Sequence, residues 1–478
     1  MMGERSKKAG EQMKNINWLE EVMNRKDELI RDTQQFLRIK SILEEDQARP
    51  GAPFGEGINQ ALSFMLEKGE QDGFISKNVD GYGGHLEMGE GEELLGILCH
   101  VDVVPEGDGW TSDPYGAEIR NGNLYARGAL DDKGPTMAAY YAMKIVKELE
   151  LPLTKRVRMI LGTDEESQWR CVDYYFKKEE MPTIGFVPDA DFPIINAEKG
   201  ICDLYLIQKE KIAEGKEATL VEFTSGRRFN MVPDIAKAVV RTNNVQSLVN
   251  NYEQYLKKTS RQGNVSIEGN TAIFEMEGLS VHGSTPEKGI NAGVYLAAFL
   301  AGQQLDGTAA AFVQFIAQSF LDDTIGQKLG IQYNDEATGD LTINVGRISY
   351  SQEEGGKLGL NIRYPVTANW ENTLAMLAER AHEFTFEKVA HLRPHHVAKD
   401  HALIRTLQRV YEEQTGEEAT LLSTGGGTYA RSLKAGVAFG PLFPGKEEFA
   451  HQKDEYIEIE DLLKATAIYA QAIYELAR

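Results

Sequence analysis

In the first 200 residues, short apolar runs alternate with segments whose apolar residues recur at helical spacing. The run "LLGILCHVDVV" (94–104) is apolar almost throughout, which is typical of a strand buried on both faces. The segment "GPTMAAYYAMKIVKEL" (134–149) has helical spacing and a proline in its first turn. Strand patterns return in "RVRMILGTDEES" (156–167), which ends in acids, and in "IGFVPDAD" (184–191). This alternation predicts an α/β fold: a three-layer αβα domain with a mixed, largely parallel sheet.

The pattern changes between residues 200 and 393. Short alternating strands dominate, as in "TAIFEMEGLSVHG" (271–283) and in residues 340–366, which contain a Gly-rich hairpin turn. A few helical segments lie between them. This stretch therefore predicts an inserted α+β domain.

The α/β pattern returns after the insert, in a helical segment at 401–416 that Asp400 is expected to cap and in a helix that ends the chain. A chain of 478 residues is also longer than one hydrophobic core usually serves. We therefore expect a discontinuous α/β domain, residues 1–199 and 394–478, interrupted by the α+β domain, residues 200–393.

Charge and hydropathy narrow the classes of partner. Lys and Arg total 51 against 73 Asp and Glu, a net charge of −22, which disfavours nucleic acid and anionic membranes as partners. No apolar run reaches 18 residues, so no membrane-spanning helix is expected. Residues 1–15 lack the apolar core of a signal peptide and are interpreted as an extension before a helix near Asn17. Three cysteines do not form a disulfide framework and suit a cytoplasmic location.

Acids and imidazoles recur where the predicted strands of the α/β domain end. In such sheets, ligands gather beyond the carboxyl ends of the strands. Like charges converging on one edge would repel each other unless cations neutralised them. The sequence therefore predicts a metal site there, drawn from these residues: His100, Asp102, Asp131, Asp132, Glu165, Glu166, Asp189 and His451.

The residue types suggest which metal and which roles. Two imidazoles and three carboxylates suit zinc, with manganese or cobalt as further options, and five ligands over two metals leave positions open for water. His100 and Asp102 share one face of a strand, so the aspartate could hold an imidazole nitrogen. The adjacent Glu165 and Glu166 should point apart, so that one binds metal and the other acts on water.

Five motifs in order carry a family resemblance: "CHVDVVPEGDGWTSDP", "ARGALDDKGPT", "LGTDEESQW", "PDADFPI" and "GGGTYAR". The chain resembles the co-catalytic zinc peptidases and deacylases, which include aminoacylase, carboxypeptidase G and carnosinase. Within that family it is most similar to the PepV-type bacterial dipeptidases. The likeness extends over nearly the whole chain from about Asn17.

The resemblance implies two divalent metal ions per chain, with zinc as the best fit and manganese or cobalt as alternatives. His100 and Asp189 would bind one ion, Glu166 and His451 the other, and Asp131 would bridge both. The α/β domain would then be catalytic and the insert a lid.

The resemblance also assigns the remaining roles. Glu165 would be the general base, supported by Asp102, and His282 of the insert would polarise the scissile carbonyl. Substrate would be bound by a further set: Asn230, Arg363, Gly425, Gly426 and Gly427. As a planar two-pronged donor, Arg363 could hold a free carboxylate.

The resulting expectation is a metal-dependent dipeptidase that removes the N-terminal residue of a dipeptide. An insert of about 190 residues is long for the family, which favours a monomer. Two alternatives stay open: a deacylase of N-acyl amino acids on the same scaffold, and an inactive peptide-binding protein. The first would act on acetyl-amino acids but not dipeptides, and the second would bind dipeptides without cleaving them.

Overall fold

The computed structural model describes residues 16–209, 218–305 and 307–478, which form two compact units. Unit 1 contains the described residues up to Asn196 together with His396–Leu422 and Gly427–Arg478. Unit 2 contains Ala197–His395, as far as described, and Ser423–Gly426. The N-terminal extension expected from the sequence, residues 1–15, lies outside the described residues.

Unit 1 is built on a mixed sheet whose centre is parallel. Strands β6, β3, β7 and β22 run parallel to one another, whereas β2 is antiparallel to β6 and β9 is antiparallel to β22. Strand β21 pairs with β9 beside the main path. In spatial order the strands are β1 (Ile75–Val79), β2 (Gly83–Met88), β6 (Arg156–Gly162), β3 (Leu94–His100), β7 (Ile184–Val187), β22 (Gly436–Ala438), β9 (Ile194–Glu198) and β20 (His395–His396), with β21 at Leu421–Thr424.

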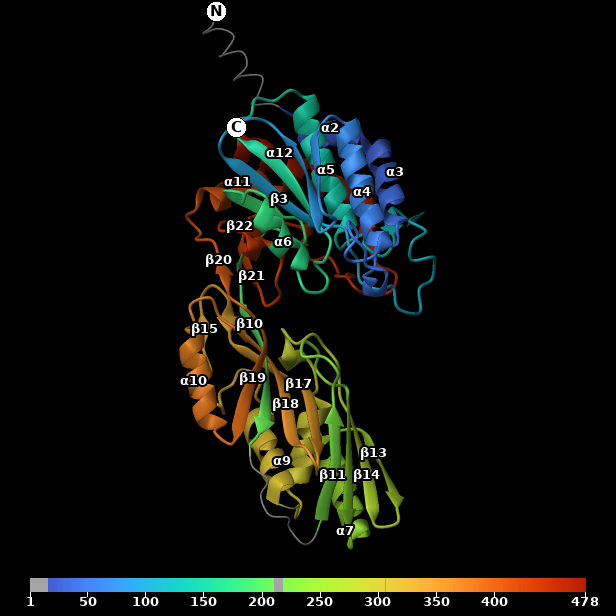
Figure 1. The fold of residues 1–478 in the computed structure, drawn as a ribbon, viewed down its shortest axis with the longest axis vertical. Coiled ribbons are helices and arrows are strands. Elements are labelled where there is room, and N and C mark those ends of the chain that lie inside the picture. The colour runs from blue at the N-terminus through green and yellow to red at the C-terminus, as the bar shows by residue number, and fades with distance from the viewer. Residues whose placement is uncertain (1–15, 210–217, 306) are drawn as a thin grey trace, which may run out of the picture. The chain divides into compact units, whose positions relative to one another are not determined.

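Helices cover both faces of this sheet (Figure 1). Consecutive residues of β2 face opposite ways: Gly84 lies against Leu66 of α4 (Glu56–Gln71), whereas His85 bonds Tyr175 of α6 (Arg170–Lys178). On the α4 face, α5 (Lys133–Glu148) packs against α12 (Ile459–Ala477), and both contact β3. The predicted three-layer αβα arrangement is therefore confirmed.

Two local expectations from the sequence need correction. The single helix expected to begin near Asn17 is divided into α2 (Trp18–Met23) and α3 (Lys26–Leu37), with Asn24 and Arg25 between them. Helix α11 (Ala402–Thr415) is capped by His401 and not by Asp400. His401 has extended backbone angles, and its Nδ1 accepts the Leu403 N–H at 3.2 Å, so the imidazole takes the place expected of a carboxylate.

Unit 2 is an eight-stranded sheet in which every pairing in the strand path is antiparallel. The predicted Gly-rich hairpin is β17–β18, and Gly356 leaves room for Phe312 of α9. The strands are, in spatial order, β13 (Gly263–Glu268), β14 (Thr271–Glu277), β12 (Ile235–Thr242), β11 (Ala218–Ser225), β17 (Thr342–Ser351), β18 (Gly355–Tyr364), β10 (Gly200–Gln208) and β19 (Phe384–Leu392). Its helices, partly labelled in Figure 1, are α7 (Val245–Thr259), α8 (Ala292–Ala301), α9 (Gly307–Phe320) and α10 (Trp370–Arg380).

Short elements complete the two units. A three-stranded sheet joins β4 (Glu118–Arg120), β5 (Asn123–Tyr125) and β24 (Tyr456–Glu458). Two small pairs are β8 (Ala190–Asp191) with β23 (Pro441–Leu442), and β15 (Asn334–Asp335) with β16 (Gly339–Asp340). The 3-10 turns are η2 (Glu45–Gln47), η3 (Pro286–Lys288) and η4 (Tyr429–Ser432).

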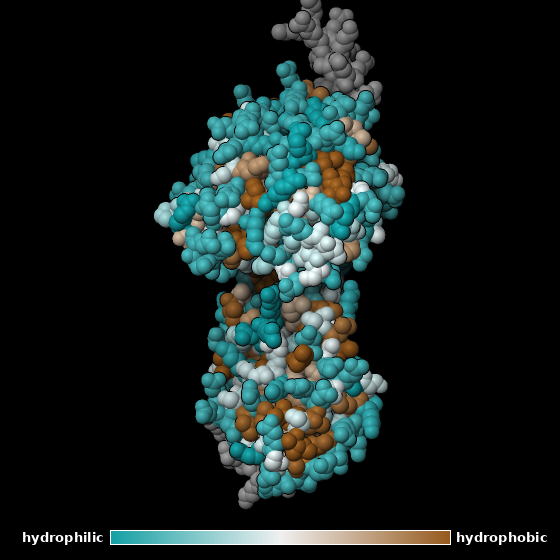
Figure 2. Space-filling view, turned by 90° about the vertical axis from the view of Figure 1, so that its right-hand side faces the viewer, coloured by the Kyte–Doolittle hydropathy of each residue, from teal (hydrophilic) through white to brown (hydrophobic). Residues whose placement is uncertain are grey.

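Each unit has its own hydrophobic core. On the face drawn in Figure 2, hydrophilic residues cover most of the surface, and hydrophobic residues gather in separate patches. Among the described residues, none of the helices combines the length and the apolar character needed to cross a bilayer. The three cysteines, Cys99, Cys171 and Cys202, are buried free thiols.

Candidate active site

The carboxyl edge of the parallel strands in unit 1 brings together the acids and imidazoles singled out in the sequence. His100 is the last residue of β3, while Glu165 and Glu166 follow β6 and Asp189 follows β7. Parallel strands end at the same sheet edge, so residues far apart in the chain meet there. Asp131 precedes α5, and His451 lies in the long connection between β23 and β24.

The side-chain atoms lie at distances suited to a shared cation site. His100 Nε2 is 3.0 Å from Asp131 Oδ1 and 3.7 Å from Asp189 Oδ2. His451 Nε2 is 2.9 Å from Asp131 Oδ2 and 3.0 Å from Glu166 Oε1. Asp131 thus faces one imidazole with each of its oxygens, which is the arrangement expected of a bridging ligand.

Two overlapping groups of potential ligand atoms occur in this cluster. His100, Asp131 and Glu166 each offer an atom within 4.8 Å of the others, and so do His100, Glu165 and Asp189. The donor set of imidazoles and carboxylates fits zinc, manganese or cobalt. Glu165 lies close enough to serve as a ligand, so its role as a base requires a direct test.

Asp102 connects this cluster to the glutamate pair through backbone hydrogen bonds. Its two carboxylate oxygens accept the N–H groups of Glu165 at 3.2 Å and of Glu166 at 3.1 Å. His100 Nδ1 lies 2.9 Å from the Asp102 backbone carbonyl and 3.5 Å from its carboxylate. Asp102 therefore holds the loop that presents both glutamates, and the nearest partner of the imidazole is its carbonyl oxygen.

Burial and mutual repulsion perturb the acids of the cluster. Burial raises the pKa of Glu165 well above its ordinary value, and the charges of Glu166 and Asp131 add to this. The pKa of Asp189 is raised in the same way, by burial and then by Asp131. The pKa of Asp131 is lowered, because hydrogen bonds from His100 and His451 outweigh its burial.

The neighbouring carboxylates raise the pKa values of the two imidazoles. Burial alone would lower the pKa of His451, but its contacts with Asp131 and Glu166 raise the pKa to about 11. The pKa of His100 is also raised, by Asp102 and Asp131 against the effect of burial. An acidic cluster that draws protons onto its imidazoles in this way fits divalent cations, which would neutralise the same carboxylates.

Two further acids support the cluster, and neither could be given this role from the sequence. Asp132 is buried, and its Oδ2 accepts the His100 N–H at 3.1 Å and the Thr136 hydroxyl at 3.1 Å. Glu455 accepts backbone N–H groups of the Asp131 loop. The sequence pointed to Asp132 through its place beside Asp131, whereas the only sequence feature of Glu455 was its nearness to His451.

The histidine and asparagine expected to contact substrate lie on neighbouring loops of unit 2. Met231 and His282 form an isolated β-bridge, and the Asn230 carbonyl accepts the Gly283 N–H at 2.7 Å. His282 Nδ1 is 2.7 Å from the Ser284 hydroxyl. These contacts bring His282 and Asn230 to one end of the unit 2 sheet.

Arg363 lies in β18 and is buried, with 4% of its surface exposed. Its Nε donates to Asn361 Oδ1 at 3.0 Å, and its Nη1 donates to the Gly425 carbonyl. The next glycine, Gly426, donates its N–H to Thr424 Oγ1 at 2.9 Å, and Gly427 lies against the Arg431 side chain. Arg363, Gly425 and Gly426 thus belong to unit 2, whereas Gly427 belongs to unit 1.

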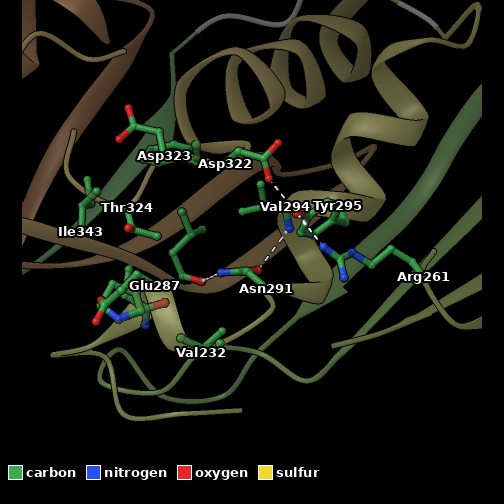
Figure 3. Close-up of a pocket in the computed structure, with 15 residues that line it drawn as sticks. Val232, Arg261, Glu287, Asn291, Val294, Tyr295, Asp322, Asp323, Thr324 and Ile343 are labelled. Carbon is green, nitrogen blue, oxygen red and sulfur yellow. Dashed lines mark hydrogen bonds between the residues drawn. The ribbon is translucent and has the colours of Figure 1, made fainter. Parts of the chain in front are cut away.

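A separate cavity of about 360 Å³ lies within unit 2, beside the 286–289 stretch that follows His282. Arg261 Nη2 donates to the Tyr295 hydroxyl at 2.9 Å, and that hydroxyl donates to Asp322 at 2.7 Å (Figure 3). The cavity contains none of the predicted site residues. The cavity is therefore separate from the cluster of acids and imidazoles in unit 1.

A three-layer αβα domain with imidazoles and carboxylates gathered at the carboxyl edge of its sheet suits a metal-dependent hydrolase. The model of peptidase family M20/M25/M40 matches residues 96–475, and the chain belongs to this family. It is 58% identical over 465 residues to "Putative dipeptidase YtjP" of Bacillus subtilis, covering 97% of this chain and 100% of that protein. A "Putative dipeptidase" of Staphylococcus epidermidis is 43% identical over 464 residues, covering 96% and 99%.

Solved structures share the fold at low sequence identity. The di-peptidase Dug1p from Saccharomyces cerevisiae matches with a TM-score of 0.58 and 12% identity, over 96% of this chain and 98% of that one. Human carnosine dipeptidase 1 matches with a TM-score of 0.54 and 15% identity, over 96% and 98%. The predicted family resemblance is confirmed, and the chain is a dipeptidase-like hydrolase of this family.

Proposed function

We propose that this protein hydrolyses dipeptides and releases the N-terminal residue, using water activated by two divalent metal ions and Glu165. One observation carries the proposal: His100, Asp131, Glu166, Asp189 and His451 converge, with contacts of 2.9–3.7 Å between their side-chain atoms, although 351 positions separate the first from the last. The names of its relatives, which describe dipeptidases, support the substrate class.

The metal ligands are proposed as follows. His100 and Asp189 would hold one ion, Glu166 and His451 the other, and Asp131 would bridge them, with zinc preferred and manganese or cobalt as alternatives. When bound, such a pair of ions supplies Lewis acidity, which acidifies water and polarises a carbonyl. The bridging role is supported by the two oxygens of Asp131, each of which faces a different imidazole.

Glu165 is the proposed proton carrier. Its carboxylate takes a proton as water attacks the amide carbon and then gives the proton to the leaving amine. Asp102 keeps the glutamate in place by accepting its N–H.

The lid domain, proposed as residues 200–393, would supply the substrate contacts to the catalytic domain, residues 1–199 and 394–478. His282 would donate to the developing oxyanion, and Ser284 at its Nδ1 is suited to fixing its ring. Arg363 would bind the free carboxylate of the dipeptide, with Asn230 and the glycines Gly425, Gly426 and Gly427 lining the substrate. The length of the lid favours a monomer, and the free thiols favour the cytoplasm.

The test compares Glu165→Ala with Glu166→Ala after reconstitution with zinc. Glu165→Ala should keep two zinc ions per chain but lose about 10²- to 10⁴-fold in kcat, because only the proton carrier is gone. Glu166→Ala should lose zinc as well as activity. Equal zinc loss in both variants would mean that Glu165 is a ligand, and the proposed division of roles would be wrong.

The substrate assay should include dipeptides and N-acetyl amino acids. The proposal predicts turnover of dipeptides that have both a free amine and a free carboxylate. Turnover of acetyl-amino acids alone would make the protein a deacylase. Tight dipeptide binding by the zinc-loaded protein without cleavage would make it a binding protein.

A further inference from the structure

Glu455 and Arg127 form a buried ion pair directly beneath the cluster. Both side chains are almost inaccessible to water, with Glu455 at 0% and Arg127 at 1% exposed surface. Arg127 Nη1 donates to Glu455 Oε2 at 2.5 Å. The two residues are 328 positions apart, so the pair joins the segment after His451 to the segment before Asp131.

The second oxygen of Glu455 is engaged by the Asp131 loop. Glu455 Oε1 accepts the Leu130 N–H at 2.9 Å and the Asp131 N–H at 3.2 Å. A charged acceptor buried away from water forms stronger hydrogen bonds than a neutral one. The backbone of Asp131 is therefore fixed by a carboxylate that lies only four residues after His451.

Arg127 also holds the loop that follows His100 and Asp102. Its Nη2 lies 3.4 Å from the Pro105 carbonyl and 3.2 Å from the Glu106 carbonyl. Trp110 covers the guanidinium at 5.3 Å and donates to the same Glu106 carbonyl at 2.7 Å. One guanidinium thus joins the segments that carry His100, Asp131 and His451.

We propose that Glu455, oriented by Arg127, is a positioning residue that sets the place of Asp131 between the two metal ions. This inference rests on the proposed di-metal site. A buried ion pair is on average no more stabilising than apolar residues of the same size, so stability alone does not account for it. A positioning role does account for the pair, because one Glu455 oxygen accepts from the guanidinium and the other accepts from two backbone N–H groups.

Glu455→Gln tests the proposal because the amide cannot replace both contacts. If the amide oxygen of the glutamine accepts the two N–H groups, the amide NH₂ faces the Arg127 guanidinium, and two donors then meet. In the reverse orientation the amide oxygen accepts from Arg127, and the hydrogen bonds from the two N–H groups are lost. The matched control is Glu87→Gln, which breaks the buried Arg158–Glu87 pair, 2.6 Å, between β2 and β6. Both substitutions remove one charge from a buried pair of unit 1.

The readout is metal affinity, measured on the purified full-length chain by competition for zinc with a chromophoric chelator. Glu455→Gln should weaken zinc binding by about 10- to 100-fold, as expected when a group that orients a ligand is lost. Its cobalt-loaded form should show a visible spectrum altered from the wild type. Glu87→Gln should leave the zinc affinity and the cobalt spectrum unchanged.

Glu455→Asp serves if the Gln variant does not fold. It keeps the charge beside Arg127 but is one methylene too short to reach both partners, so it should weaken zinc binding as well. A folded Glu455 variant with wild-type zinc affinity and cobalt spectrum would overturn the positioning role. If the wild type itself bound no zinc, the proposed function would fail, which is a separate outcome.

Discussion

Asp102→Asn is the substitution whose effect follows most directly from the geometry. The carboxylate accepts the N–H of Glu165 with one oxygen and that of Glu166 with the other, at 3.2 and 3.1 Å, and only 3% of the residue is exposed. An asparagine keeps one acceptor and turns an NH₂ group toward the second N–H. Losing one hydrogen bond to a charged group costs about 1.5–3 kcal/mol.

If that cost falls on the arrangement in which both glutamates are in place, kcat/KM should fall about 10- to 150-fold, because each 1.36 kcal/mol added to the barrier lowers the rate tenfold. The assay is steady-state hydrolysis of a dipeptide by zinc-loaded protein, with zinc content measured on the same samples. A kcat/KM within threefold of the wild type would refute the positioning role of Asp102.

Asp323→Asn is the matched control for this prediction. Asp323 also accepts two backbone N–H groups, from Ile325 at 3.0 Å and from Lys328 at 2.7 Å, and is 7% exposed. It lies in unit 2, outside the metal cluster. The control should lose comparable local stability while kcat/KM stays near the wild-type value.

Three further predictions concern the substrate, the pH dependence of stability and the metal. Arg363→Ala should raise KM for dipeptides at least about tenfold and leave KM for amidated dipeptides unchanged, since the guanidinium is proposed to bind the free carboxylate. An equal rise in KM for both substrates would exclude this role of Arg363. Burial, followed by the charge of Arg158, lowers the pKa of His85 to about 4, against about 6.5 when unfolded, so the unfolded chain binds the extra proton as pH falls through this window. Between pH 7 and pH 5 the metal-free protein should lose up to about 2 kcal/mol of unfolding free energy that His85→Gln does not lose, measured by urea denaturation; identical losses would refute it. Removing the metal with a chelator should lower Tm by about 5–10 °C, because two sites filled at 100 Kd contribute about 5 kcal/mol. A Tm that calorimetry finds unchanged would count against the two sites.

The fold of unit 1 was largely predictable because its periodic signals are local. The apolar run at 94–104 becomes β3, which ends at His100, and the segment at 134–149 becomes α5. The five motifs, which occur in the order typical of the family, then indicated which strand ends carry the site residues. The cap of α11 was mispredicted, because an aspartate and a histidine stood next to each other and propensity favours the aspartate.

The support of the site could not be predicted in the same way. Glu455 gains its environment from Arg127 and from the N–H groups of Leu130 and Asp131, all more than 320 positions away, and no period or spacing in the sequence connects them. The carboxylate of Asp102 was expected at an imidazole nitrogen, whereas in the structure it accepts two backbone N–H groups. Such partners depend on how loops from separate strands pack together, which a single sequence does not encode locally.

Anomalous diffraction at the zinc edge from crystals of the zinc-loaded protein would show which side chains hold the metal ions. We expect two peaks per chain, one contacted by His100 and Asp189, the other by Glu166 and His451, with Asp131 touching both. A full zinc complement bound elsewhere, with these five side chains free of metal, would contradict it.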